Sequence, residues 1–268
     1  MANLTALLIM IFLYAPIVVM IIFSFNSSVS TSVMSGFSTR WYVSLIHDEG
    51  TIKSVYNTLI LAVCSSLCAT VMGTAAAVGI NAMKKKWLKK TTMSVTNIPM
   101  MNPEIVTGIS MMLLFVFIGS LFGKTGTLGF TTLLIAHITF ELPYVILNVL
   151  PKLRQTDPHL AEAAQDLGCT PGQAFFKVVV PSIMPGIISG LVMAFTLSVD
   201  DFIISYFVSG TNSQTLPIRI FSMTKRRVTP DMYALSTLVF LAILVLLVIS
   251  NTISARGDKK NKKGGANK

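Results

Sequence analysis

Six long apolar segments limit what this chain can fold into more than any other feature of its sequence. They lie near residues 4–25, 55–83, 98–122, 128–150, 183–208 and 232–254. Each reaches or exceeds the roughly 20 residues that an α-helix needs to cross a bilayer. Of the 268 residues, 53% are hydrophobic and only 12% are charged, and the mean hydropathy is +0.71. These values exclude an ordinary soluble domain and predict an all-α integral membrane protein with six transmembrane helices.

Lysine and arginine residues predict which side of the membrane each loop faces. Fourteen of the 21 basic residues fall within residues 84–90, 152–177 and 256–268, and six spans place these three segments on one side. Loops rich in Lys and Arg face the cytoplasm, so we expect both termini there. The first apolar segment is too long for the core of a signal peptide and is expected to stay as a span. The net charge of +10 then reflects topology rather than nucleic-acid binding.

A short polar stretch after the fourth apolar segment carries strong helix signals of its own. Asp157, followed by a proline, is typical of a helix start, and Gly168 is typical of a helix end. Thr170, with a glutamine three residues later, predicts a capping box for a second helix, which Pro181 is expected to end. We therefore predict a cytoplasmic helix–turn–helix loop over residues 157–181. The alternative is an ordinary cytoplasmic loop.

The first helix of this loop is predicted to have a small apolar face and a charged face. Residues at spacings of three and four share one face of a helix. The apolar set is Leu160, Ala163, Ala164 and Leu167, and the polar set off that face is His159, Glu162 and Asp166. A capped helix outside the bilayer suggests that a partner outside the bilayer binds it.

Four acidic residues lie in or beside the apolar segments: Glu104, Glu141, Asp200 and Asp201. A charged side chain at the centre of a span costs about 2.5–3.5 kcal/mol by insertion scales. Each of these acids is therefore expected to have a functional or structural role. Glu104 follows Asn102 and Pro103 at a predicted helix start, where the helix dipole favours an acid. It fits a structural cap as well as a substrate contact.

The fourth span carries a polar stripe. His137, Glu141, Tyr144 and Asn148 recur at spacings of four, three and four, which places them on one face of an otherwise apolar helix. That face must meet protein or water rather than lipid. Pro143 within the span is expected to bend it. The alternative to a transport role is a His137–Glu141 pair that only fixes packing.

The fifth span carries two adjacent carboxylates. Ser198, Asp201 and Ser205 share one face of the predicted helix, and Thr196 and Asp200 share the adjacent one. Both carboxylates can border one cavity, where a cationic substrate would balance their charge. Alternatively, both lie near the outer membrane interface, where solvent screens them.

Other kinds of site lack support in the sequence. Gly123, Lys124 and Thr125 look like the end of a nucleotide-binding loop, but Ile118 stands where that motif requires glycine. No cluster of His and Cys has metal-ligand spacing, and there is no nucleophile elbow. Catalysis by this chain and a cofactor bound to it are therefore not expected.

The motif Glu162-Ala163-Ala164-x-x-Leu167-Gly168, in an inward loop of a six-span protein, resembles the EAA loop of the permease subunits of bacterial ABC importers. Further runs resemble the spermidine/putrescine permeases of the PotC type within that group. They are residues 25–28, 37–42, 102–106, 137–140, 195–201 and 216–223. The resemblance covers about residues 10–255, so residues 1–255 are assigned to one permease domain and residues 256–268 to a disordered basic tail.

This resemblance implies a six-helix fold of the type I importer (MetI-like) class in the bacterial cytoplasmic membrane. It implies a second homologous permease, a cytoplasmic ATPase dimer that binds ATP and Mg²⁺, and an extracellular or periplasmic polyamine-binding protein as partners. The ATPase-coupling residues would be Glu162, Ala163, Ala164, Asp166, Leu167 and Gly168. The substrate pathway would include Asp200, Asp201, Glu141, Tyr144, Ser198 and Glu104.

Two alternatives remain open. One is a permease of the same family for another solute. The other is an ion-coupled transporter or channel in which His137 and Glu141 relay protons. Glu141 departs from the resemblance, because an uncharged residue is expected there. Four basic residues on the predicted outer side, Arg219, Lys225, Arg226 and Arg227, would repel a polycation. Either they dock an acidic binding protein or that loop folds back.

Overall fold

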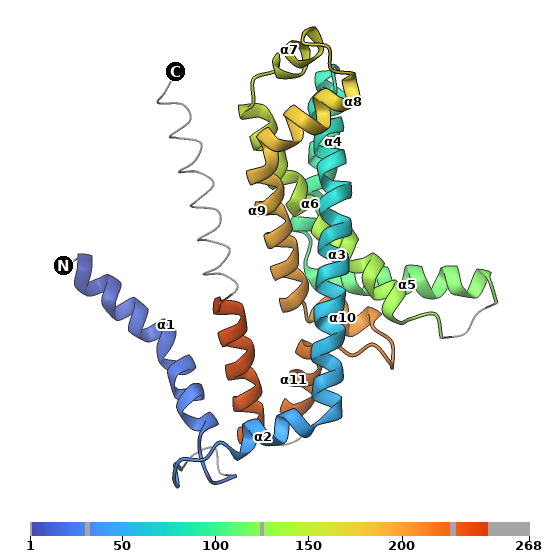
Figure 1. The fold of residues 1–268 in the computed structure, drawn as a ribbon. Coiled ribbons are helices and arrows are strands. Elements are labelled where there is room, and N and C mark those ends of the chain that lie inside the picture. The colour runs from blue at the N-terminus through green and yellow to red at the C-terminus, as the bar shows by residue number, and fades with distance from the viewer. Residues whose placement is uncertain (1, 30–32, 124–125, 226–228, 246–268) are drawn as a thin grey trace. The chain divides into compact units, whose positions relative to one another are not determined.

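A computed structural model describes residues 2–29, 33–123, 126–225 and 229–245 (Figure 1). Within these ranges the chain is helical, and the β-structure is limited to one isolated bridge between Asn26 and Phe37. The labelled helices are α1 (Ala2–Ser24), α2 (Arg40–His47), α3 (Glu49–Ala82), α4 (Lys86–Met101), α5 (Glu104–Leu121), α6 (Phe130–Gln155), α7 (Leu160–Asp166), α8 (Pro171–Ala174), the π-helical η1 (Phe175–Val179), α9 (Val180–Asp200), α10 (Ile203–Val208) and α11 (Leu216–Thr224). The prediction of an all-α membrane protein is confirmed.

Five of the six expected spans are helices long and apolar enough to cross a membrane. They are residues 4–24, 49–82, 104–121, 130–155 and 171–200. The last described residues, 230–245, form a shorter apolar helix. This helix covers most of the expected sixth span at 232–254. The predicted tail at 256–268, and also Arg226 and Arg227, lie outside the described residues.

The chain divides into two compact units. Of the described residues, one unit contains those within 58–214, and the other contains those within 2–57 together with 215–245. The long helix α3 contributes to both. The candidate substrate and coupling residues all belong to the first of these units.

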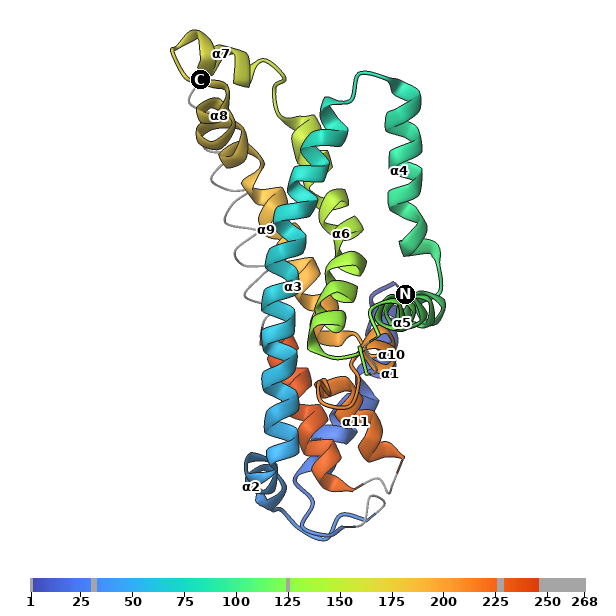
Figure 2. The ribbon, with the colours of Figure 1, turned by 90° about the vertical axis from the view of Figure 1, so that its right-hand side faces the viewer.

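In this unit, α6 and α9 run side by side and form the main packing interface (Figure 2). Gly186 and Gly190 face α6 so closely that an added Cβ would lie 2.8 Å from the Lys152 side chain and 3.3 Å from that of Val145, respectively. Small residues are the usual means of close helix contact in lipid. Buried Ile183 and Ala194 belong to the same core.

One unbroken helical segment leads from the polar loop to the acidic residues. Helices α8, η1 and α9 follow one another without a gap, so Pro181 lies inside the segment and does not end it as predicted. The wider π-helical turn at 175–179 ends two residues before Pro181, whose missing N–H would interrupt a regular α-helix. The 30 residues from Pro171 to Asp200 span about 45 Å at 1.5 Å per residue. The polar loop and α10 thus lie at opposite ends of α9 (Figures 1 and 2).

The other unit is built around α2, α11 and the start of α3. Leu45, Leu216, Ala234 and Leu235 form its buried core. Trp41 Nε1 donates a hydrogen bond of 2.7 Å to the carbonyl of Asn26, which ties α2 to the segment after α1.

Candidate functional site

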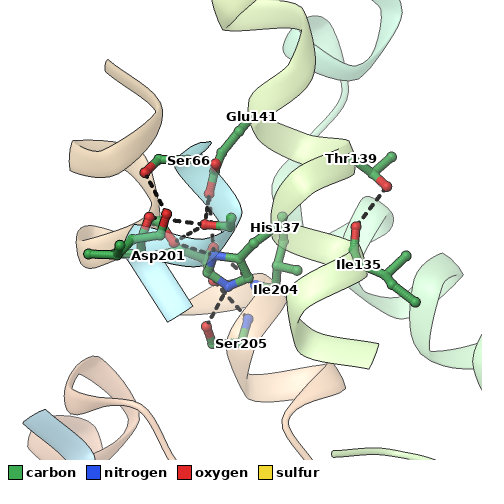
Figure 3. A network of polar contacts seen from close by, with 12 residues as sticks. Ser66, Ile135, His137, Thr139, Glu141, Asp201, Ile204 and Ser205 are labelled. Carbon is green, nitrogen blue, oxygen red and sulfur yellow. Dashed lines mark hydrogen bonds and ion pairs between the residues drawn. The ribbon is translucent and has the colours of Figure 1, made fainter. Parts of the chain in front are cut away.

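A buried polar network lies at the α10 end of α9 (Figure 3). Its side chains come from four helices, of which α3, α6 and the consecutive pair α9 and α10 are distant in sequence. They are Ser65 of α3, His137 and Glu141 of α6, Ser198 of α9, Asp201 at the break after α9, and Ser205 of α10. His137 is 1% exposed and Glu141 is completely buried. Because unpaired buried polar groups are costly in a membrane protein, such a network must be closely matched.

Hydrogen bonds connect the imidazole to the glutamate through two serines. His137 Nδ1 lies 2.8 Å from Ser198 Oγ, which lies 3.0 Å from Ser65 Oγ. Ser65 Oγ donates to Glu141 Oε1 at 2.7 Å. The direct distance between His137 Nδ1 and Glu141 Oε1 is 3.8 Å, so the serines are the closer partners of both residues. His137 and Glu141 are therefore connected mainly through the hydroxyl groups of Ser198 and Ser65.

Asp201 and Ser205 lie on the other side of the imidazole, beside Nε2. His137 Nε2 lies 3.0 Å from Ser205 Oγ and 3.5 Å from Asp201 Oδ2. The Asp201 carboxylate also accepts hydrogen bonds from the backbone N–H groups of Ile204 at 3.3 Å and Ser205 at 2.8 Å. Asp201 thus caps the first turn of α10, where the exposed N–H groups favour a negative charge.

The break between α9 and α10 separates the two adjacent acids. Asp201 is 8% exposed, whereas the side chain of Asp200, the last residue of α9, is exposed. A continuous helix over 183–208, as predicted, would have left both on neighbouring faces. The break turns one carboxylate into a structural cap and leaves the other accessible to a ligand.

The polar stripe of the fourth span faces other helices of its unit, as its spacing predicts. Asn148 Oδ1 accepts a hydrogen bond of 3.1 Å from Ser189 on α9. Tyr144 is half-buried and packs edge-on against Phe140, with 5.6 Å between the ring centroids. Tyr144 and Asn148 are outside the hydrogen-bonded chain that joins His137 to Glu141.

Two other placements bear on the predicted pathway. Glu104 is the first residue of α5 and is exposed, and no hydrogen bond ties it to the buried network in the described chain. Ser65 was absent from the sequence prediction. The only signal for it is a pair of serines, Ser65 and Ser66, inside an apolar span, and a hydroxyl can bond its own helix as readily as a distant partner.

The polar loop has the predicted capping chemistry. Gly168 has a φ of +89°, and hydrogen bonds from its N–H to Gln165 and from the Cys169 N–H to Ala164 complete a Schellman motif. The capping box at Thr170 is also present. The first helix starts at Leu160, two residues later than predicted, because Asp157 caps a preceding turn through the N–H of His159 at 2.9 Å.

The predicted apolar face of α7 is only partly buried. Ala164 is buried and Leu160 is half-buried, but Ala163 is exposed and Leu167 is 88% exposed. The helix ends at Asp166, so Leu167 follows the last helical residue and does not complete the face. Glu162, Ala163, Asp166 and Leu167 are all open to a partner.

His159 and Glu162 form an exposed pair on this loop, with 3.0 Å between Nδ1 and Oε2. The hydrogen bond and charge of Glu162, together with the charge of Asp157, raise the pKa of His159 above its ordinary value. A raised pKa means that the pair stabilises the loop fully below about pH 6.5 and loses this effect as the pH rises through the higher pKa.

We expect Glu162→Gln to lower the pKa of His159 toward its ordinary value, measured by NMR titration of labelled histidine. Asp166→Asn on the same helix is the matched control and should change this pKa much less. An unchanged titration in the Glu162 variant would show that the pair does not form in solution.

Arg219, one of the four basic residues that oppose polycation entry, folds back onto its own unit. Its Nη2 lies 2.8 Å from Asp48 Oδ2, at the start of α3. Asp48 also accepts a hydrogen bond from Thr51, which, with the charge of Arg219, holds its pKa below the ordinary value. Of the two explanations for these basic residues, folding back holds for Arg219.

Within the described ranges, no group of three or more His, Cys, Asp or Glu side chains is placed to hold a metal ion. The site consists of the exposed carboxylate of Asp200 beside the buried carboxylate of Asp201, at one end of a long helical segment. The other end of this segment carries the exposed polar loop at 157–181. The sequence profile of a family described as "Binding-protein-dependent transport system inner membrane component" matches residues 69–263. The chain belongs to this family.

The permease is similar in sequence to curated transport proteins. It is 39% identical over 249 residues to the putrescine transport system permease protein PotI of Escherichia coli K12, covering 93% of this chain and 89% of PotI. It is 36% identical over 250 residues to the spermidine/putrescine transport system permease protein PotC of the same organism, covering 93% of this chain and 92% of PotC. The resemblance inferred from the motifs is confirmed.

A solved structure shares the fold of the permease. It is the bacterial alginate ABC transporter in complex with a periplasmic protein bound to an alginate pentasaccharide, with a TM-score of 0.74 and 19% identity. The match covers 96% of this chain and 93% of that one. The permease is therefore a transport component of the inner membrane with an importer fold, and family members of this kind are membrane subunits rather than enzymes.

Proposed function

We propose that this permease carries polyamines, such as putrescine or spermidine, across the cytoplasmic membrane as one subunit of an ATP-driven importer. The observation that carries the proposal is the exposed carboxylate of Asp200 beside the buried Asp201, at the break in a membrane helix. An ammonium group leaving water requires such a partner. The printed names of PotI and PotC support the choice of substrate.

Energy reaches the permease through the loop at 157–181. Its exposed residues, Glu162 and Leu167 foremost, form the surface that a cytoplasmic ATPase dimer would grip. ATP and Mg²⁺ bind to that dimer and not to this chain. This orientation places both termini in the cytoplasm, in line with the distribution of basic residues. A second homologous permease and an extracellular polyamine-binding protein complete the assembly.

The continuous segment from α8 through α9 is suited to transmit the motion. A displacement of the loop at Pro171 moves a helical rod of about 45 Å whose far end carries Asp200. ATP-driven closure would thereby switch the acidic end between outward and inward openings. Substrate binding and ATP hydrolysis are linked through a single structural element.

Reconstitution of the permease with its partner permease, ATPase and binding protein in proteoliposomes tests the proposal. Polyamine uptake should require ATP on the side of the vesicle membrane where the ATPase lies. Polyamines should also stimulate ATP hydrolysis. Uptake driven by a proton gradient without the ATPase would instead indicate an ion-coupled transporter. Stimulation by another solute but not by polyamines would overturn the substrate assignment and leave the family unchanged.

A further inference from the structure

The buried network has a direction, because each serine hydroxyl has only one hydrogen to donate. Ser65 donates to Glu141 at 2.7 Å, a shorter contact than its alternative to the carbonyl of Ala62 at 3.4 Å. Ser198 must then donate to Ser65, and the Nδ1–H of His137 must donate to Ser198. Every hydrogen along the chain points from the imidazole toward the glutamate.

The same four groups can be connected in the opposite direction. In that arrangement Glu141 carries a hydrogen on Oε1 and donates it to Ser65, Ser65 donates to Ser198, and Ser198 donates to His137 Nδ1. The two arrangements differ by one proton: the N–H bond at His137 breaks and an O–H bond at Glu141 forms, while each serine gives up one hydrogen and receives another. Neither atoms nor net charge change within the network.

The charges around the chain make both ends competent to hold this proton. With the shared proton on Nδ1 and a second hydrogen on Nε2, the His137 ring is a cation, and its Nε2–H faces Ser205 at 3.0 Å and Asp201 at 3.5 Å. When the proton is on Glu141, the ring is neutral and keeps only its Nε2–H, and the buried glutamate loses its charge. Glu141 Oε2 has no hydrogen-bond partner in the described chain, so an ionised Glu141 is incompletely stabilised.

We propose that His137 and Glu141 share one proton through Ser198 and Ser65, and that an ammonium group arriving at Asp200 drives this proton from His137 to Glu141. This inference rests on the proposed polyamine function. Asp200 is adjacent to Asp201, which faces His137, so a cation bound at Asp200 lies on the order of 10 Å from the imidazolium. At that distance, with an effective dielectric constant of about 20, the repulsion shifts the proton equilibrium by at most roughly tenfold, because a proton on Glu141 still feels part of it.

The relay would in turn strengthen substrate binding. Once His137 is neutral, the charge of Asp201 is no longer balanced by the ring, and the acidic end of α9 attracts the ammonium group more strongly. Linkage requires the two effects to be equal, so the relay is worth up to about tenfold in polyamine affinity. Glu141 thus affects ligand binding without touching the ligand, because it accepts the proton that His137 gives up.

NMR of the ¹⁵N-histidine-labelled assembly tests the proton transfer directly, since the chain has 3 histidines. The His137 signals are assigned by their loss in His137→Asn. Addition of putrescine should convert His137 Nδ1 from a protonated to an unprotonated nitrogen. Infrared difference spectroscopy of the same samples should show a new carboxylic-acid band that is missing in Glu141→Gln.

Ser65→Ala cuts the relay, and Ser66→Ala is its matched control. Ser66 is the neighbouring buried serine, and its Oγ bonds the carbonyl of Val63 in its own helix at 3.3 Å. Ser65→Ala should abolish the response of His137 to putrescine and raise the KM for polyamine uptake by up to about tenfold. Ser66→Ala should preserve both.

The outcomes separate this inference from the function on which it rests. If putrescine binds and Asp200→Asn weakens that binding, but the protonation of His137 does not change in the wild type, the relay is wrong and the importer function stands. If putrescine neither binds nor is taken up, the proposed function fails. The wild-type NMR measurement decides the relay even if the Ser65 variant does not fold.

Discussion

Gly168→Asp is expected to reduce ATP-driven uptake to near background while the protein still inserts into the membrane. Gly168 has a φ of +89° and ends α7 in a Schellman motif, and a residue with a side chain in this conformation costs about 1–2 kcal/mol. The strain would displace the exposed Glu162 and Leu167, which we propose contact the ATPase. The spans do not depend on this turn, so insertion should be unaffected.

The measurement compares uptake, ATP hydrolysis and membrane abundance of the variant with those of Gly172→Asp. Gly172 is the matched control: it lies on the same loop, neither it nor Gly168 has an atom within 4 Å of an added Cβ, and it lacks a positive φ. An aspartate in the first turn of α8 is favourable. Equal uptake by the two variants would contradict a coupling role for the α7 turn.

Asp200→Asn is expected to lower kcat/KM for polyamine uptake by roughly 10- to 100-fold without destabilising the protein. Asp200 is exposed, so its loss leaves no buried group unpaired. A hydrogen bond to a charged group contributes about 1.5–3 kcal/mol, which corresponds to this range. Uptake is measured with labelled putrescine, and stability is measured by thermal unfolding in detergent.

Asp201→Ala supplies the contrasting result. Asp201 caps α10 and faces His137 in a buried site, so its removal should destabilise the protein by about 2 kcal/mol or more. We expect a lower unfolding temperature for Asp201→Ala and an unchanged one for Asp200→Asn. Wild-type uptake in the Asp200 variant would move the ammonium site away from the end of α9.

Local signals predicted the polar loop well because its chemistry is local. The capping box at Thr170 and the left-handed turn at Gly168 depend on residues within a few positions, and both are present. The end of the second helix at Pro181 was predicted wrongly. A proline interrupts a regular α-helix, but the π-helical turn at 175–179 precedes it and the helix continues.

The sequence by itself determined the membrane class, the approximate positions of most spans and the family, because apolar length and short motifs are properties of contiguous residues. It also placed His137 and Glu141 on one helix face, since helical periodicity does so without reference to any neighbour. Only the tertiary structure decided that Ser65 joins them and that Asp201 is buried while Asp200 is exposed. These facts depend on where α3 packs and where α9 breaks, which result from contacts between residues up to 133 positions apart in the chain.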